Sequence, residues 1–405
     1  MTAPADTALR TMHPIRDKTY RRWLIGTGIS LFGDQFYVVA LPWLVLQTLD
    51  SPALLGSVMM AGALPRALLL LVGGVMIDRF SARQVMLGAA LIRALCVAAT
   101  AMLVGSGALA PALLYALVVV FGIVDAFALP AQAALLPAIL NRDQLIAGSA
   151  LGQSAAQIAA IAGPIPAGLA IAHLGADVAL YIDAASFLGV IAVLYNMPNP
   201  PRAVTGATTG RTVRDGIACV MRDRALLSMI AMASLINLCA AGPLLIGMAE
   251  IARYRLGSPA AYGTLVSAAA FGGLGGTLLA APLAKFRRGI VVLGAAGVLA
   301  LCLAGIGLSP AKLFALTPLF ALVGGIAGII NIHVGAWAMQ RAPEALRGRV
   351  SSVLILATLG VMPISMALAG FVAVSGSGFM FATAGTVLLL VTIVIAVASP
   401  IRQIA

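Results

Sequence analysis

Residues 289–308 read GIVVLGAAGVLALCLAGIGL, a run of 20 residues without a single charged side chain. An α-helix needs about 20 apolar residues to cross the hydrocarbon core of a bilayer. Of the 405 residues in the chain, 61% are hydrophobic and 9% are charged, whereas a soluble globular protein carries about 25% charged residues. Strands of a membrane β-barrel would be only about 10 residues long and would alternate in polarity. The run therefore predicts a membrane-spanning helix.

Eleven further runs of the same kind precede and follow this one, so we predict an all-α integral membrane protein with twelve transmembrane helices in two six-helix bundles. The runs lie near residues 22–48, 54–77, 84–105, 110–138, 145–172, 177–197, 225–250, 259–284, 289–308, 311–340, 348–373 and 377–399.

The one long polar break between these runs divides them into six and six. We predict an N-terminal bundle over residues 1–197, a cytoplasmic linker over 198–224 and a C-terminal bundle over 225–405. The end of the linker, from about Arg211 to Arg224, has the pattern of a basic amphipathic helix that lies on a membrane surface.

The distribution of basic residues predicts the orientation. Of the 25 Lys and Arg residues, Arg66 and Arg93 fall inside helices, and Arg253, Arg255 and Lys312 fall on one side of the membrane. All the others fall on the opposite side, which also holds both termini. Because cytoplasmic loops are enriched in Lys and Arg, we expect both termini in the cytoplasm, and a multi-pass protein of a bacterial-type inner membrane.

Composition also bears on the classes of function that can be excluded. The net charge of +12 is explained by short basic loops, so we expect no nucleic-acid partner. The four cysteines have no metal-ligand spacing, and we expect no metal and no cofactor. The sequence has neither a phosphate-binding G-x-x-x-x-G-K-[ST] loop nor a nucleophile elbow. We therefore predict that the protein is not an enzyme, and we expect a monomer in a lipid bilayer.

Several short motifs resemble those of one transporter family. Residues 74–83 read GVMIDRFSAR, which resembles the G-x-x-x-D-R-x-G-R-[RK] signature of the loop between helices 2 and 3 in the major facilitator superfamily. The segments at 33–35, 130–137 and 340–352 resemble an exporter branch that contains macrolide-efflux and enterobactin-exporter proteins. The resemblance covers nearly the whole chain, and it implies the twelve-helix fold and a transport function.

The resemblance further implies an inner gate. An aspartate just below helix 2 can meet the positive N-terminal end of a facing helix in one conformation of the transporter. Ser81 and Ala82 depart from the signature, so Arg79 or Arg83 would take the ionic role. The alternative is that these are ordinary solvated charges that set topology. The gate candidates are Gly74, Asp78, Arg79, Arg83, Asp125, Arg347 and Arg349.

Helix 5 carries a second motif. Gly163, Pro164 and Gly168 lie in the sequence GPIPAG, which resembles the G-P-x-x-G-G element of superfamily exporters. Proline and glycine allow a membrane helix to bend and to pack closely. The alternative is a kinked helix with no role beyond packing.

Three charges fall near the middle of the membrane. Asp34, Arg66 and Arg93 come out at similar depths in helices 1, 2 and 3. A charge at that depth is costly and normally faces a partner or a cavity. We predict a charge cluster in which Asp34 is the proton-coupling candidate. The alternative is a static ion pair that holds helices 1–3 together.

Polar residues elsewhere in the spans are candidates for a substrate cavity, although such residues are more often structural. They are Gln35, Tyr37, Gln153, Gln157, Asn237 and His333.

Taken together, these features predict a secondary transporter that exports a hydrophobic or amphiphilic small molecule by alternating access, as a proton-coupled antiporter. Two alternatives remain open. One is a lysophospholipid or lipid flippase of the same fold, and the other is a transport-dead membrane sensor that keeps the fold.

Overall fold

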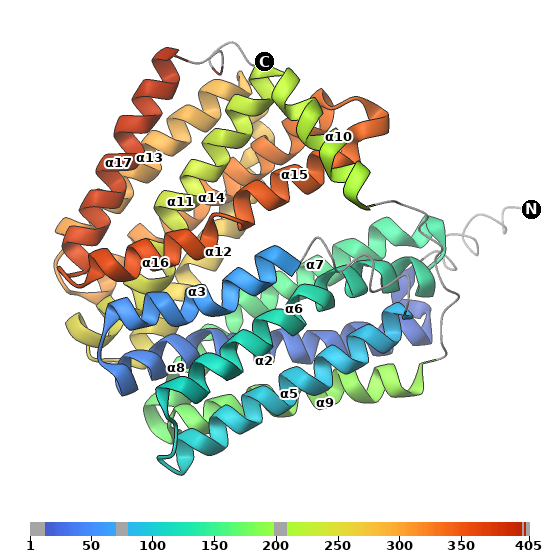
Figure 1. Ribbon diagram of the computed structural model, residues 1–405, viewed down its shortest axis with the longest axis vertical. Helices are drawn as coiled ribbons and strands as arrows, with labels where there is room; N and C mark the ends of the chain where they lie inside the picture. Colours follow the sequence, from blue (N-terminus) through green and yellow to red (C-terminus); the bar gives the residue numbers. More distant parts are fainter. Residues whose placement is uncertain (1–12, 70–79, 198–208, 399–400, 402–405) are drawn as a thin grey trace, which may run out of the picture. The chain divides into compact units, whose positions relative to one another are not determined.

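The computed structural model describes residues 13–69, 80–197, 209–398 and 401. Within these ranges, twelve helical segments are long and apolar enough to cross a bilayer (Figure 1). The long uncharged runs give these helices apolar surfaces. Because a helix satisfies all its backbone hydrogen bonds internally, it can be surrounded by lipid. The predicted all-α membrane fold is confirmed.

The helices follow the predicted runs closely. Those of the first half are α2 (Lys18–Leu49), α3 (Pro52–Leu69), α5 (Ala82–Gly105), α6 (Pro111–Ile139), α7 (Leu145–Ala162), α8 (Pro164–Leu174) and α9 (Ala176–Asn196). The amphipathic segment of the linker forms α10 (Thr209–Arg222). Those of the second half are α11 (Arg224–Glu250), α12 (Pro259–Leu283), α13 (Arg288–Leu308), α14 (Leu313–Arg341), α15 (Arg347–Leu359), α16 (Met362–Ala373) and α17 (Ser377–Ala398).

Two spans are interrupted, and the first interruption lies at the glycine–proline motif of helix 5. The span divides into α7 and α8 at Gly163 because Pro164 has no N–H to donate to the helix. A Cβ added at Gly163 would lie 2.6 Å from Cγ of Gln35, so α2 packs directly against this break. The eleventh span divides in the same way into α15 and α16, around Gly360.

The contacts among the helices divide the chain into two compact units. One consists of residues 1–40 and 68–206, and the other consists of residues 41–67 and 207–405. This grouping differs from the predicted bundles in the placement of residues 41–67, so the bundle boundaries remain a prediction. Both α2 and α3 cross from one unit to the other, and each contains an internal proline close to the crossing, Pro42 and Pro65 respectively.

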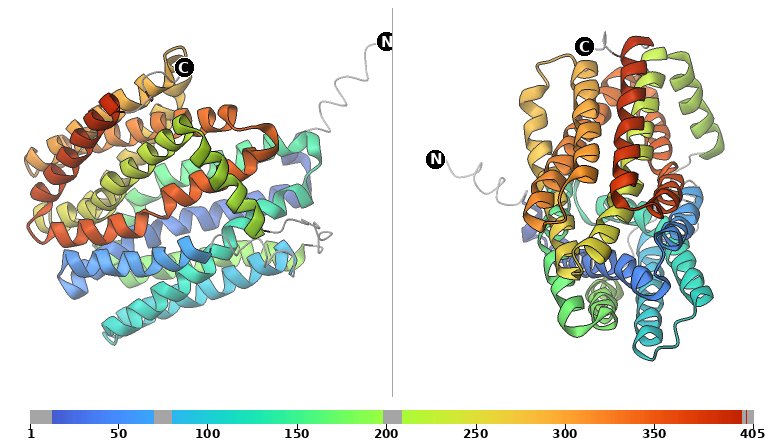
Figure 2. Two further views of the ribbon diagram at one scale, coloured as in Figure 1. Left: turned by 45° about the horizontal axis from the view of Figure 1, so that its top comes forward. Right: turned by 90° about the vertical axis from the view of Figure 1, so that its left-hand side faces the viewer.

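Within the second unit, the tightest packing joins α12 to α14 through glycine. A Cβ added at Gly272 or Gly276 would collide with a carbonyl oxygen of α14, and one added at Gly324 would collide with a carbonyl oxygen of α12. Small residues let membrane helices approach until their backbones touch. The two views in Figure 2 show the helices of each unit from further directions.

Candidate functional site

A cluster of charged side chains lies inside the first unit, far from the ends of the helices that carry it. Arg93 of α5 donates a hydrogen bond from Nη2 to Oδ1 of Asp34 in α2, with 2.8 Å between the two atoms. Its other terminal nitrogen, Nη1, lies 3.8 Å from Oδ1 of Asp125 in α6. The predicted proximity of Asp34 and Arg93 is therefore present as a direct ion pair.

Aromatic rings surround the guanidinium of Arg93. Its central carbon lies 4.8 Å from the ring centroid of Phe121 in α6 and 4.7 Å from that of Phe187 in α9. Tyr37 of α2 stacks on Phe121, with 4.6 Å between the ring centroids. A cation over an aromatic face is stabilised by the quadrupole of the ring, most strongly where water is excluded. The rings therefore favour a charged Arg93 at this depth.

Sequence reasoning missed a fourth charged residue of this cluster. Asp183 of α9 is fully buried, and its carboxyl lies against the backbone of α2, because a Cβ added at Gly33 would come within 3.3 Å of its Oδ1. The signal in the sequence was available: Asp183 is an acidic residue in the interior of the sixth apolar run, where a charge is costly and therefore functional by default.

A small cavity adjoins the ion pair. It has a volume of about 70 Å³, and Asp34, Arg93, Thr27, Ser30 and Gln132 contribute the polar side chains of its lining. A cavity needs roughly 10–15 Å³ of probe-occupied volume to hold one water molecule. The cavity can therefore hold water beside the Asp34 carboxyl.

The remaining predicted members of the cluster and cavity are distributed over both units. Arg66, with an exposed side chain, belongs to the second unit, whereas Asp34 and Arg93 belong to the first. Gln35, Tyr37, Gln153 and Gln157 lie in the first unit, and Asn237 and His333 lie in the second.

His333 is buried, and its Nδ1 lies 2.9 Å from the carbonyl oxygen of Ile329 one turn earlier. Asn237 donates to the carbonyl oxygen of Ala233 in its own helix. The substrate cavity remains a prediction.

Part of the predicted inner gate lies outside the described residues, namely Gly74, Asp78 and Arg79. Arg83 is described, and its guanidinium donates to the carbonyl oxygens of Leu194 and Tyr195, at 2.6 and 2.8 Å. These carbonyls end α9, where the helix dipole favours a cation. Arg83 therefore fastens the start of α5 to the end of α9.

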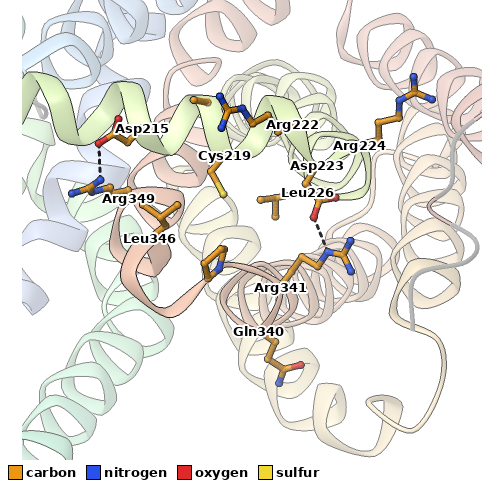
Figure 3. A pocket seen from close by; sticks show the side chains of 12 residues that line it. Asp215, Cys219, Arg222, Asp223, Arg224, Leu226, Gln340, Arg341, Leu346 and Arg349 are labelled. Atoms are coloured by element: carbon orange, nitrogen blue, oxygen red, sulfur yellow. Dashed lines mark hydrogen bonds and ion pairs between the residues drawn. The ribbon is translucent and has the colours of Figure 1, made fainter.

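Arg349, another residue of the predicted gate, forms an ion pair with the linker helix α10. Nη1 of Arg349 lies 2.6 Å from Oδ2 of Asp215 in α10, and Nε of Arg341 lies 2.7 Å from Oδ2 of Asp223, the residue between α10 and α11 (Figure 3). The two ion pairs border a crevice of about 990 Å³ that α10 forms with the ends of α14 and α15. Arg347, next to this crevice in the chain, is exposed.

Asp223 has a second role as the N-cap of α11. Its Oδ1 accepts hydrogen bonds from the backbone N–H groups of Ala225 and Leu226, at 3.0 and 3.2 Å. Burial raises the pKa of the Asp223 carboxyl, but the hydrogen bond and charge of Arg341 and the two backbone donors outweigh burial, so the pKa lies below its ordinary value. The stability that Asp223 contributes is therefore present at neutral pH and is lost as the pH falls through its folded-state pKa.

We expect Asp223→Ala to destabilise the protein by about 1 kcal/mol, the usual effect of losing an N-cap carboxylate. Thermal unfolding of the purified protein in detergent measures the change. Asp215→Ala is the matched control, since it removes only a solvent-exposed ion pair, worth about 0–1 kcal/mol. Equal melting temperatures for the two variants would show that the cap contributes nothing.

The sequence of the chain is similar to those of known membrane transporters. The profile of the Major Facilitator Superfamily matches residues 23–362. The multidrug efflux pump Tap of Mycolicibacterium fortuitum is 28% identical over 353 residues, which cover 84% of this chain and 85% of the pump. Tap of Mycobacterium tuberculosis H37Rv is 28% identical over 371 residues, which cover 86% of this chain and 85% of the pump.

Solved structures agree in fold at lower sequence identity. The nucleoside transporter NupG superposes with a TM-score of 0.75 at 16% identity, over 94% of this chain and 98% of NupG. A D-xylose–proton symporter superposes with a TM-score of 0.74 at 15% identity, over 95% of this chain and 98% of the symporter. With twelve apolar helices and a superfamily profile that spans residues 23–362, the chain belongs to the major facilitator superfamily.

Proposed function

We propose that the protein exports a hydrophobic or amphiphilic small molecule across a bacterial cytoplasmic membrane by alternating access, and that inward movement of protons drives the export. Export is supported by the relatives, which are named multidrug efflux pumps and align over 85% of their length. The solved neighbours include a proton symporter, but at their low identity they support the fold alone.

The observation that carries the proposal of proton coupling is the position of Arg93 between Asp34 and Asp125 inside the membrane. In a medium of low dielectric, a carboxylate and a guanidinium hold each other strongly, and removing one partner leaves an expensive charge. Protonation of Asp34 neutralises its carboxylate and releases Arg93. A proton can thereby change which helices the arginine connects, which is the kind of two-state element that alternating access needs.

The gate on the side away from the termini is proposed to involve α3 and α16. Both belong to the second unit, and a Cβ added at Gly56 would lie 2.6 Å from the carbonyl oxygen of Met366 and 2.8 Å from Cα of Gly370. Beside this contact, the Tyr254 hydroxyl donates to Oδ1 of Asp50 at 3.0 Å. Two helices this close exclude a substrate, so their separation would open that side.

The gate on the cytoplasmic side is proposed to include the loop 2–3 motif with Asp78, together with Arg349. In this proposal both termini and α10 are cytoplasmic, in keeping with the excess of basic residues on that side, and the protein acts as a monomer. The ion pair of Arg349 with Asp215 would then compete with any contact that Arg349 makes to the loop.

The decisive experiment uses inverted membrane vesicles that contain the protein and are acidified inside. We expect the vesicles to accumulate ethidium, a fluorescent lipophilic cation, or a neutral or anionic amphiphile from a matched panel. Accumulation should stop when an ionophore collapses the pH gradient. Accumulation no greater than in vesicles without the protein, for every compound of the panel, would refute proton-driven export of this class of substrate.

A further inference from the structure

Asp183, the fourth charged residue of the cluster, takes part in neither ion pair of Arg93, although it is the most deeply buried of the acidic residues described in the first unit. Its side chain is 0% exposed, and neither Oδ1 nor Oδ2 accepts a hydrogen bond from any described residue. The hydroxyl of Ser186, about one turn further along α9, donates its single proton to the backbone carbonyl of Asp183 at 2.7 Å. An ionised carboxylate without donors in such a place is very costly, so the neutral acid is the stable form.

The groups that face Asp183 come from the helices packed on α9. Asp34 and Tyr37 of α2 and Arg93 of α5 interact with it electrostatically, and Cys96 of α5 interacts with Tyr37. The titratable side chain of α8, His173, lies in the last turn of that helix, beside the start of α9. Arg93 thus interacts electrostatically with three carboxyls, those of Asp34, Asp125 and Asp183.

Arg93 and Asp183 are complementary in charge but form no ion pair with each other in this conformation. Nε of Arg93 is buried and donates to no described acceptor, while both oxygens of Asp183 lack a donor. Phe187, over which the guanidinium lies at 4.7 Å, follows Asp183 by one helical turn on the same face of α9. A change in the side-chain torsions of Arg93 can therefore bring it from Asp34 to Asp183 without crossing the helix.

We propose that Asp183 is a second proton-binding carboxyl, which exchanges Arg93 with Asp34 during the transport cycle. In the conformation described here, Arg93 pairs with the Asp34 carboxylate, and Asp183 is protonated. When Arg93 moves to Asp183, the Asp183 carboxyl releases its proton and becomes the carboxylate partner, and the freed Asp34 carboxylate takes up a proton. One proton is bound and one is released for each exchange, so the charge of the cluster does not change.

We assign a proton, rather than a metal ion, as the cation that neutralises the Asp183 carboxylate. Within the described residues no set of three or more His, Cys, Asp or Glu side chains is placed to hold a metal ion. Asp183 lies against the backbone at Gly33, next to Asp34 in the chain. A shift of α2 relative to α9 therefore acts on both carboxyls at once, which couples proton exchange to helix movement.

This inference rests on the proposed proton-driven transport for its place in the cycle, but proton binding by Asp183 can be measured separately. Infrared difference spectroscopy of the protein in lipid detects the C=O stretch of a protonated carboxyl in a dry environment. We expect this band at neutral pH in the wild type and in Asp177→Asn, a matched change in the first turn of the same helix. We expect Asp183→Asn to lack it. Persistence of the band in Asp183→Asn would overturn the inference.

Stability and transport provide the second readout. An amide mimics a neutral carboxylic acid, so Asp183→Asn should melt within a few degrees of the wild type, whereas loss of an ionised partner would lower the melting temperature sharply. Gradient-driven ethidium accumulation should fall by about tenfold or more, within the range of coupling factors that link two binding equilibria, while ethidium exchange without a gradient persists. Asp183→Glu should restore part of the driven transport.

The outcomes separate the inference from the proposed function. Unchanged driven transport in Asp183→Asn overturns the exchange of Arg93, as does a collapse of its melting temperature. If the wild type itself accumulates no compound of the panel, the proposed function fails, and the infrared band alone decides whether Asp183 holds a proton.

Discussion

Replacement of Arg93 by methionine is expected to abolish proton-driven transport and to destabilise the protein by about 3–5 kcal/mol, the usual result of removing one partner from a buried ion pair. The side chains of Arg93, Asp34 and Asp125 are only 16%, 23% and 15% exposed, so the little water that reaches them replaces the guanidinium poorly. Methionine keeps the apolar contact with Phe121 and Phe187. The loss is therefore electrostatic and should shrink as the pH is lowered, because protonation removes the unpaired charges.

Thermal unfolding over a range of pH, combined with gradient-driven uptake, tests this expectation. Arg93→Lys is the matched control, since it keeps the charge but loses the planar fork that can reach two carboxylates. We expect this variant to fold with most of the wild-type stability and to transport poorly. Wild-type stability and transport in Arg93→Met would show that the cluster has no function.

Replacement of Gly276 by alanine is expected to reduce the yield of folded protein and to destabilise it by about 1–3 kcal/mol, the usual effect of overpacking a close contact. The added Cβ would collide with the carbonyl oxygen of Gly325 in α14. A backbone carbonyl within a helix cannot rotate away, so the two helices must separate. Their separation would also open the neighbouring contact, where Gly272 meets Ala321.

The adjacent residue in the chain provides the control for this prediction. A Cβ added at Gly275 would meet no heavy atom within 4 Å, so Gly275→Ala should be neutral, or stabilising by up to about 1 kcal/mol through its greater helix propensity. Melting temperatures and folded yields of the two variants in detergent make the comparison. A Gly276→Ala protein as stable as Gly275→Ala would contradict the backbone contact between α12 and α14.

The sequence predicted most of the fold because membrane helices are defined by length and hydrophobicity, which are read directly from the chain. All twelve spans were predicted, as was the linker helix α10, whereas the helix predicted near residues 145–172 divides at Gly163 into α7 and α8. Membership of the major facilitator superfamily confirms the prediction of a transporter rather than an enzyme. That Asp34 and Arg93 lie at one level was also predictable, since the level follows from the distance along each helix.

What sequence reasoning could not provide is the direction in which each side chain points. A helix that is apolar all round has no polar stripe that marks its buried face. Arg66 and Arg93 therefore looked equivalent as partners of Asp34, although Arg93 makes the 2.8 Å contact. Asp125 was predicted as a gate residue, and the structure places its Oδ1 3.8 Å from Nη1 of Arg93. Asp183 was overlooked because the groups that interact with it lie on two other helices, α2 and α5, far from it in the sequence.

The course of α2 and α3 through both units has a mechanical consequence. Three peptide linkages join the units, at 40–41, 67–68 and 206–207, and two of them fall within helices beside Pro42 and Pro65. Because proline lacks an N–H, one helical hydrogen bond is already missing at each place, and bending there breaks none. Residues 41–67 are therefore joined to the first unit by helical stretches that can bend without losing a hydrogen bond. Their packing within the second unit includes close backbone contacts, such as that between Gly56 and Gly370, so a larger side chain there would act directly on the free energy of this packing.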